Sequence, residues 1–161
     1  MKPPISPKTT IGHVHLKVAD LERAVHFYTV VLGFEVSTRM GTSAAFLSAG
    51  GYHHHIGLNT WESKDAPEPP SFSTGLFHAA ILLPDRKELA RMVQRLAEHA
   101  WQLDGAADHG VSEAIYLRDP DNNGLEIYCD RARDQWPRDA QGHVVMYTEP
   151  LDLESLMAEL G

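Results

Sequence analysis

Residues 11–36 read IGHVHLKVADLERAVHFYTVVLGFEV, and this stretch decides the fold class. It begins with a short β-branched run, continues through Asp20, which can cap a helix, and then places apolar residues at helical spacing. Gly33 follows the last of these apolar residues and predicts the end of the helix. The stretch therefore predicts a strand, a helix and a second strand, in that order.

The same pattern occurs again in residues 76–101, LFHAAILLPDRKELARMVQRLAEHAW. A shift of 65 residues places His13 on His78 and Asp20 on Asp85 without a gap. The chain therefore contains a repeated unit. Two histidines occupy one equivalent position in its two copies.

Each copy continues with three short strand patterns. They lie at residues 34–40, 43–49 and 53–60 in the first copy, and at 99–104, 111–117 and 124–129 in the second. The turns between them are predicted at Gly41, Gly50, Gly51, Gly105, Gly110 and the run DPDNNG at 119–124. The order predicted for each copy is thus βαβββ.

The predicted fold class is α+β, with two tandem βαβββ modules in one domain over residues 9–130. The first module covers residues 9–61, a Pro- and Ser-rich linker covers 62–75, and the second module covers 76–130. Residues 131–161 form a C-terminal extension. Its segment DLESLMAEL has a capping aspartate and predicts a short helix, packed on the body or on a second subunit.

Composition narrows the function classes. The formal net charge of −8 argues against nucleic acid and against an anionic membrane as partners, which favours a small-molecule substrate. No stretch approaches the roughly 20 apolar residues that a membrane-spanning helix needs. A single cysteine and a polar N-terminal segment predict a cytoplasmic protein.

Strand parity suggests a metal site. In the first strand Val14 and Leu16 take the side covered by the helix, so His13 and His15 take the other. His78 lies on the equivalent face of the second copy, and Glu126 alternates with apolar neighbours in the last strand. If the modules close into one curved sheet, two imidazoles and a carboxylate converge. That set leaves coordination positions open and suits Fe(II), with Mn(II) as a near substitute. His15 competes with His13 for the role of ligand.

The segments HVHLKVADLERAVHFYTVVLGF, GLFHAAILL and YLRDPDNNGLEIY resemble the vicinal oxygen chelate superfamily. That superfamily includes glyoxalase I, bleomycin and fosfomycin resistance proteins, and extradiol dioxygenases. The resemblance covers residues 9 to about 130. It implies a cupped mixed sheet around a divalent metal, with His13, His78 and Glu126 as ligands, and it implies a homodimer.

Within the superfamily, the chain is most similar to the catechol 2,3-dioxygenase branch. The sequence HHIGLN resembles the His-His pair on the last strand of the first module, and it points to His55 as the acid-base catalyst. Tyr116 lies ten residues before Glu126 and matches the tyrosine of the branch, while His109 matches a histidine shortly before that tyrosine. The resemblance implies Fe(II)- or Mn(II)-dependent ring cleavage of a small catechol-like aromatic, with O2 as co-substrate.

The roles that the resemblance implies follow from ordinary chemistry. An imidazole with a pKa near neutrality can take the catechol proton and return it during ring cleavage, which is the role of His55. Tyr116 would hydrogen-bond a substrate oxygen, and His109 would position the ring or close the pocket. His53 and His54 are open alternatives to His55.

Two other functions remain as alternatives. A glyoxalase I-like lyase or isomerase would act on a glutathione hemithioacetal, and it needs a further carboxylate from the last strand of the first module. Residues 53–60 contain no Asp or Glu. A metal-free drug-binding resistance protein is the other alternative, although such proteins usually lack the ligand triad.

Overall fold

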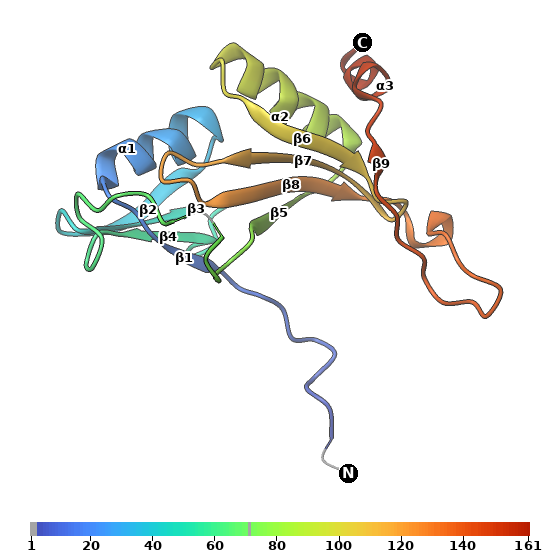
Figure 1. Ribbon diagram of the computed structural model, residues 1–161, viewed down its shortest axis with the longest axis horizontal. Helices are drawn as coiled ribbons and strands as arrows, with labels where there is room; N and C mark the ends of the chain where they lie inside the picture. The colour runs from blue at the N-terminus through green and yellow to red at the C-terminus, as the bar shows by residue number, and fades with distance from the viewer. Residues whose placement is uncertain (1–2, 71) are drawn as a thin grey trace. The chain divides into compact units, whose positions relative to one another are not determined.

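The computed structural model describes residues 3–70 and 72–161, which divide into two compact units. Unit 1 comprises the described residues up to Thr29 together with Gly33–Ala66, and unit 2 comprises Val30–Leu32 and the described residues from Pro67 to Gly161. The predicted α+β class is confirmed, and each unit carries its own sheet and helix (Figure 1).

Unit 1 contains a four-stranded sheet. Its elements are β1 (Val14–Lys17), α1 (Leu21–His26), β2 (Glu35–Met40), β3 (Ala44–Ser48) and β4 (Ile56–Asn59). A π-helical turn, Phe27–Val31, continues α1. The strand order is β1-β4-β3-β2, with β1 parallel to β4 and the other pairs antiparallel.

Unit 2 repeats this arrangement and adds one strand. Its elements are β5 (Ala79–Leu83), α2 (Arg86–Glu98), β6 (Leu103–Asp108), β7 (Ser112–Arg118), β8 (Gly124–Asp130), β9 (Glu149–Pro150) and α3 (Leu153–Met157), with 3-10 turns at Arg133–Gln135 and Ala158–Leu160. The strand order is β5-β8-β7-β6-β9, and β5 is parallel to β8. The first four strands have the order found in unit 1, so the predicted repeat is confirmed.

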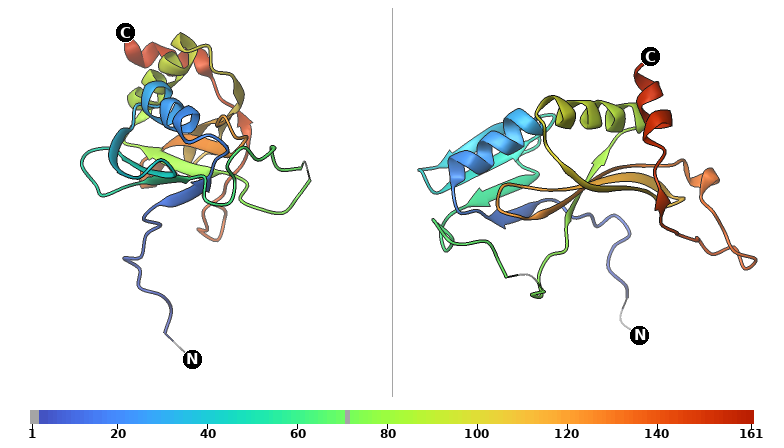
Figure 2. Two further views of the ribbon diagram at one scale, coloured as in Figure 1. Left: turned by 90° about the vertical axis from the view of Figure 1, so that its left-hand side faces the viewer. Right: turned by 45° about the horizontal axis from the view of Figure 1, so that its top comes forward.

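Aspartate caps start the helices where the sequence places them. The carboxylates of Asp20, Asp85 and Asp152 accept hydrogen bonds from the backbone N–H three residues later, at 3.0, 2.9 and 2.9 Å. Each cap satisfies a backbone donor that the helix itself leaves free. The expected C-terminal helix forms within unit 2, where Leu156 is fully buried and α3 lies beside α2 (Figure 2).

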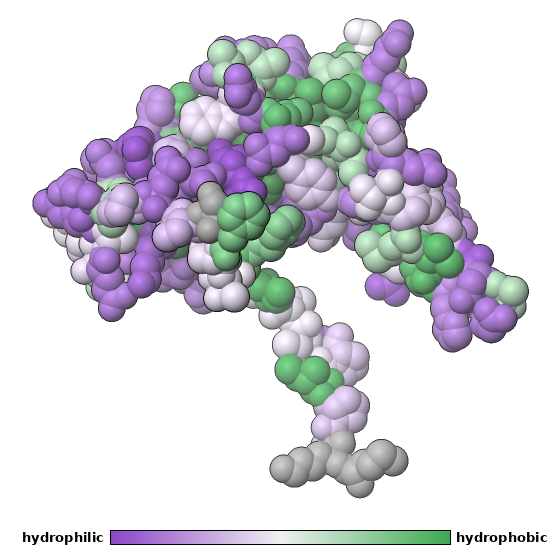
Figure 3. Space-filling model, viewed as in Figure 1, coloured by the Kyte–Doolittle hydropathy of each residue, from purple (hydrophilic) through white to green (hydrophobic). Residues whose placement is uncertain are grey.

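The cores of the two units follow strand parity. In unit 1 the alternate residues Leu16 and Val18 are buried, while His15 and Lys17 are exposed. In β8 Leu125 and Ile127 are buried between half-exposed residues. Hydrophilic residues cover most of unit 1 on the face shown in Figure 3, as a strongly acidic composition leads one to expect. In the described part of the chain, no helix has the length and apolarity to cross a membrane.

Two predicted strands differ from those observed. The strand expected at 99–104 is β6, Leu103–Asp108, because α2 runs to Glu98 and the chain then turns at Ala100, whose φ is 51°. Gly105, expected in a turn, lies inside β6 at a shift of register. The strand expected at 53–60 is shorter, Ile56–Asn59. The left-handed glycines Gly50 and Gly51 turn the chain before it, so the three consecutive histidines precede the strand.

Candidate functional site

Four side chains of unit 2 form a continuous hydrogen-bonded set, which we call the unit 2 cluster: His78, Glu126, Tyr116 and His109. His78 Nε2 lies 2.9 Å from Glu126 Oε2, and the Tyr116 hydroxyl donates to Glu126 Oε1 at 2.8 Å. His109 Nε2 lies 2.6 Å from the same hydroxyl. Unit 2 therefore brings together every site residue that the sequence predicts within it.

The sheet register explains how the cluster forms. Tyr116 on β7 pairs directly with Glu126 on β8, so the two side chains leave the same face of the sheet side by side. His78 immediately precedes β5, the other neighbour of β8. His109 lies in the turn between β6 and β7. Two adjacent strands, the residue directly before a third strand and one turn thus supply the four side chains.

Gly124 is a positional requirement that sequence reasoning missed. A Cβ at Gly124 would clash with the Phe77 carbonyl oxygen and would lie 3.2 Å from His78 Cβ. Any larger residue would push the start of β5 away from β8. The signal was present in the sequence, since Gly124 ends the turn run and lies two residues before Glu126.

The electrostatics of the cluster favour a protonated tyrosine. Burial raises the pKa of Tyr116, and its hydrogen bond to Glu126 raises that pKa further. A phenol with a raised pKa keeps its proton at neutral pH and remains a hydrogen-bond donor. The side chains of His78 and Glu126 are 28% and 15% exposed, so both are accessible to a small ligand.

The pair His78 and Glu126 fits a divalent ion. Two neighbouring ligands at about 2.1 Å from an octahedral ion lie about 3 Å apart, and His78 Nε2 and Glu126 Oε2 are 2.9 Å apart. Imidazole with carboxylate is a donor set suited to Fe(II) and Mn(II). Among the residues that the structure describes, neither unit by itself gathers three His, Cys, Asp or Glu side chains that could hold an ion.

His13, the third predicted ligand, lies in unit 1, directly before β1. This is the position that His78 has before β5. The ring of His54 lies 4.3 Å from that of His13, between centroids, and also contacts Phe46. His15, the competing ligand, packs its ring against Phe46 and Trp61.

The three consecutive histidines have different surroundings. His55 Nδ1 accepts the Ala49 backbone N–H at 3.3 Å, which places the proton of a neutral ring on Nε2. His53 is exposed, and its Nδ1 lies 2.8 Å from His54 Nδ1. His54 is half-buried; burial first, and then the neighbouring His13, lowers its pKa. His55 was predicted as catalyst, but His54 is the one in ring contact with His13.

Comparison of the two sheets identifies the unit 1 counterpart of Glu126. Ala80 pairs with Glu126 in unit 2, and its repeat equivalent His15 pairs with Gly57 in unit 1. The His15 ring lies over that glycine, since a Cβ at Gly57 would be 2.9 Å from His15 Cγ. Unit 1 therefore has no carboxylate at the position where unit 2 has its candidate ligand.

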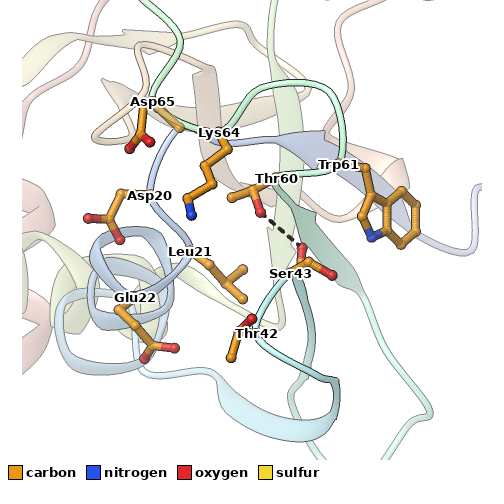
Figure 4. Close-up of a pocket in the computed structure, with 10 residues that line it drawn as sticks. Asp20, Leu21, Glu22, Thr42, Ser43, Thr60, Trp61, Lys64 and Asp65 are labelled. Atoms are coloured by element: carbon orange, nitrogen blue, oxygen red, sulfur yellow. Dashed lines mark hydrogen bonds between the residues drawn. The ribbon is translucent and has the colours of Figure 1, made fainter.

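Unit 1 also contains a hollow of about 590 Å³ outside the predicted site (Figure 4). Asp20, Thr60, Trp61 and Lys64 are among its lining residues, and none of the predicted site residues lines it. A second hollow of about 380 Å³ includes Tyr52 and His53.

Comparison with known proteins supplies the family. The family model described as the Glyoxalase/Bleomycin resistance protein/Dioxygenase superfamily matches residues 10–127. A solved structure, that of lactoylglutathione lyase from Agrobacterium tumefaciens, superimposes with a TM-score of 0.60 over 77% of this chain and 96% of that one. At 20% identity, this likeness concerns the fold alone.

Among the curated relatives, two that carry the name of a dioxygenase illustrate the similarity. The catechol-2,3-dioxygenase of Bacillus subtilis (strain 168) is 44% identical over 158 residues, which is 98% of this chain and 54% of that protein. The biphenyl-2,3-diol 1,2-dioxygenase 3 of Rhodococcus globerulus is 28% identical over 74% of this chain and 63% of its own length. The chain thus spans roughly half to two thirds of the length of these relatives.

Proposed function

Because the chain belongs to the glyoxalase, bleomycin resistance protein and dioxygenase superfamily, we propose that it is a metal-dependent extradiol dioxygenase that cleaves a small catechol-like aromatic with O2. The unit 2 cluster is the observation that carries the proposal. It joins a histidine and a glutamate suited to an ion with a tyrosine and a second histidine suited to proton transfer. The relative named catechol-2,3-dioxygenase, 44% identical, supports the reaction class.

For the metal we propose His78 and Glu126 as ligands, with His13 as the third. Support for His13 comes from its position in the repeat, directly before the first strand of its unit as His78 is in the other. When bound, Fe(II) or Mn(II) would supply open coordination positions and a route for electrons from the aromatic substrate to O2.

The chain's own residues would bind the substrate and move its protons. Tyr116, which keeps its proton, would donate a hydrogen bond to a substrate oxygen. His55 would take the catechol proton at Nε2 and return it later. To accept a proton at Nε2, the neutral His55 ring must first carry its hydrogen on Nδ1. In that form Nδ1 no longer accepts the hydrogen bond from the Ala49 N–H. His54 is the alternative, because its ring lies beside that of His13.

The glyoxalase-like alternative is disfavoured by Gly57. That chemistry uses a further carboxylate from the last strand of the first unit, and the position equivalent to Glu126 holds a glycine covered by the His15 ring. The drug-binding alternative is disfavoured by the His78–Glu126 pair, whose spacing fits an ion.

The proposal is tested with protein purified without oxygen and loaded with one equivalent of Fe(II) or Mn(II). A panel of catechols should give oxygen uptake together with the yellow absorbance of a ring-opened product. A hemithioacetal substrate should give no turnover. Glu126→Gln should lose bound metal and oxygen uptake together. Metal-loaded protein that consumes no oxygen with any catechol, or that isomerises the hemithioacetal, would overturn the proposal.

A further inference from the structure

The C-terminal extension reaches the unit 2 cluster through His109. The Tyr147 carbonyl oxygen lies 2.9 Å from His109 Nδ1, and the Tyr147 N–H donates to the His109 carbonyl at 3.4 Å. Thr148 Oγ1 lies 3.3 Å from the same ring nitrogen. Residues far from His109 in sequence therefore surround one side of its imidazole.

The segments before and after Tyr147 are both held in place by backbone hydrogen bonds. Upstream, the Val145 N–H donates to the Pro137 carbonyl at 2.9 Å. Downstream, β9 pairs with β6, the strand that leads into His109, with Glu149 opposite Asp108. Beyond β9, Leu156 of α3 is fully buried. The position of Tyr147 is thus set by the fold of unit 2.

Gly110 allows the segment to come this close. A Cβ at Gly110 would lie 2.6 Å from Tyr147 Cε1 and 2.9 Å from Pro137 Cγ, and its φ of +76° already favours glycine. The Tyr147 ring therefore packs directly on the turn that carries His109. The ring of Tyr147 thus contacts the turn, and its backbone carbonyl contacts the imidazole of His109.

The chemistry of the contact fixes where the His109 proton sits. A carbonyl oxygen can only accept, so Nδ1 must carry the hydrogen that Tyr147 receives. In a neutral imidazole Nε2 is then the acceptor, and it faces the Tyr116 hydroxyl at 2.6 Å. We infer that the C-terminal extension is a positioning element that holds His109 as the Nδ1–H tautomer, so that its Nε2 is an acceptor that competes with Glu126 for the Tyr116 hydrogen.

The consequence concerns Glu126 and rests on the proposed function. Before substrate binds, the one hydroxyl hydrogen of Tyr116 has two acceptors, Glu126 Oε1 at 2.8 Å and His109 Nε2 at 2.6 Å. The structure has this hydrogen donated to Glu126. When it turns to His109 instead, the Glu126 carboxylate is free to bind an ion. With the other tautomer, His109 would donate to Tyr116 and direct its hydrogen to Glu126.

The first test reads the tautomer directly in the full-length, metal-free protein. Nitrogen-15 NMR of histidine-labelled protein, at a pH where the ring is neutral, shows which nitrogen carries the hydrogen. The His109 signals are assigned by their loss in His109→Asn. We expect the hydrogen on Nδ1. A His109 ring protonated on Nε2 would overturn the inference, whatever reaction the protein catalyses.

The second test asks whether the extension holds the tautomer. Tyr147→Ala removes the ring packed on Gly110, and Met146→Ala, at a neighbouring side chain that is 65% exposed, is its matched control. Tyr147→Ala should increase the Nε2–H form and lower kcat about tenfold with KM within about twofold, because a catalytic group is misplaced. Met146→Ala should change neither.

The outcomes separate the two proposals. An unchanged tautomer in folded Tyr147→Ala would overturn the role of the extension. An Nδ1–H tautomer that responds to Tyr147→Ala, in a protein that oxidises no catechol, would support the positioning role and refute the proposed function.

Discussion

Tyr116 is the central residue of the unit 2 cluster, because its hydroxyl contacts both Glu126 and His109. Its raised pKa comes mainly from burial and then from the adjacent carboxylate. The hydroxyl is therefore a donor throughout the neutral range. The hydroxyl contributes a directed hydrogen bond, because a phenylalanine ring at this position would pack equally well.

Tyr116→Phe should keep the fold and the bound metal but lower kcat about a hundredfold to a thousandfold, because it removes one preorganised donor. Tyr128→Phe, two residues from Glu126 on the same strand, is the control and should stay within about threefold of wild type. Steady-state oxygen uptake and metal analysis measure both. If Tyr116→Phe loses its metal, the tyrosine acts on Glu126 rather than on substrate.

Cys129 illustrates a residue that burial makes inert. It is 3% exposed, and desolvation followed by the charge of Glu113 raises the pKa of its thiol to about 11. A raised pKa favours the protonated thiol in the folded state. The contribution of this pKa shift to the free energy of unfolding is therefore present below about pH 9. It is lost as the pH rises from about 9 through 11.

We therefore expect Cys129 to react slowly with a thiol reagent at pH 8, where only about a thousandth of the thiol is ionised. The rate should rise roughly tenfold per pH unit until the fold opens, and unfolded protein should react at once. Absorbance after addition of an aromatic disulfide reagent follows the reaction. Rapid labelling of the native protein at pH 8 would contradict the burial of this side chain.

The elements of unit 2 are joined by a buried glutamate. Glu113 on β7 is 6% exposed, and it pairs with Arg86 Nε at 2.7 Å and with Arg131 Nη2 at 2.9 Å. Arg86 also donates to the Ser155 carbonyl of α3 at 3.0 Å and pairs with Glu159 at 2.7 Å. One carboxylate thus organises the arginine that anchors the C-terminal helix.

Glu113→Ala should lower the free energy of unfolding by about 3 kcal/mol, because it leaves two partly buried arginines without their shared partner. The matched control is Glu88→Ala, which removes the more exposed partner of Arg91 and should cost less than about 1 kcal/mol. Urea unfolding followed by fluorescence measures both. Equal effects of the two substitutions would show that the Glu113 network contributes little.

At the scale of the whole molecule, the repeat gives two units of one topology with different chemistry. Both carry a histidine directly before their first strand. Unit 2 places Glu126 where unit 1 has Gly57. Unit 1 instead packs the rings of His15 and His54 against Phe46, and the ring of His13 lies beside that of His54. The two units therefore share a strand order, while the side chains at equivalent positions differ.

A whole-chain prediction follows for the metal. His13→Ala should weaken Fe(II) binding at least about tenfold, since even the loss of a residue that only supports a ligand costs that much. His26→Ala, at an exposed position at the end of α1, is the matched control and should leave binding unchanged. Anaerobic titration with Fe(II) measures both. Full metal binding by His13→Ala would leave His78 and Glu126 as the only proposed protein ligands.

The sequence by itself determined the repeat, the helix starts and the α+β class, because capping aspartates, glycine turns and apolar periodicity are local properties of the chain. It also singled out His78 and Glu126 through the repeat and strand parity, and Tyr116 and His109 through the resemblance to the dioxygenase branch. It misplaced β6 and lengthened β4, because where a helix or turn ends depends on neighbours that the local pattern does not contain.

Only the tertiary structure decided the contacts of those residues. The sheet register places Tyr116 beside Glu126. The absence of a side chain at Gly124 and at Gly110 allows His78 and Tyr147, respectively, to pack closely against these positions. It also distinguished His54 from His55, which are adjacent in sequence but contact different neighbours. Hydrogen-bond partners far apart along the chain meet through packing, and packing is not encoded at any single position.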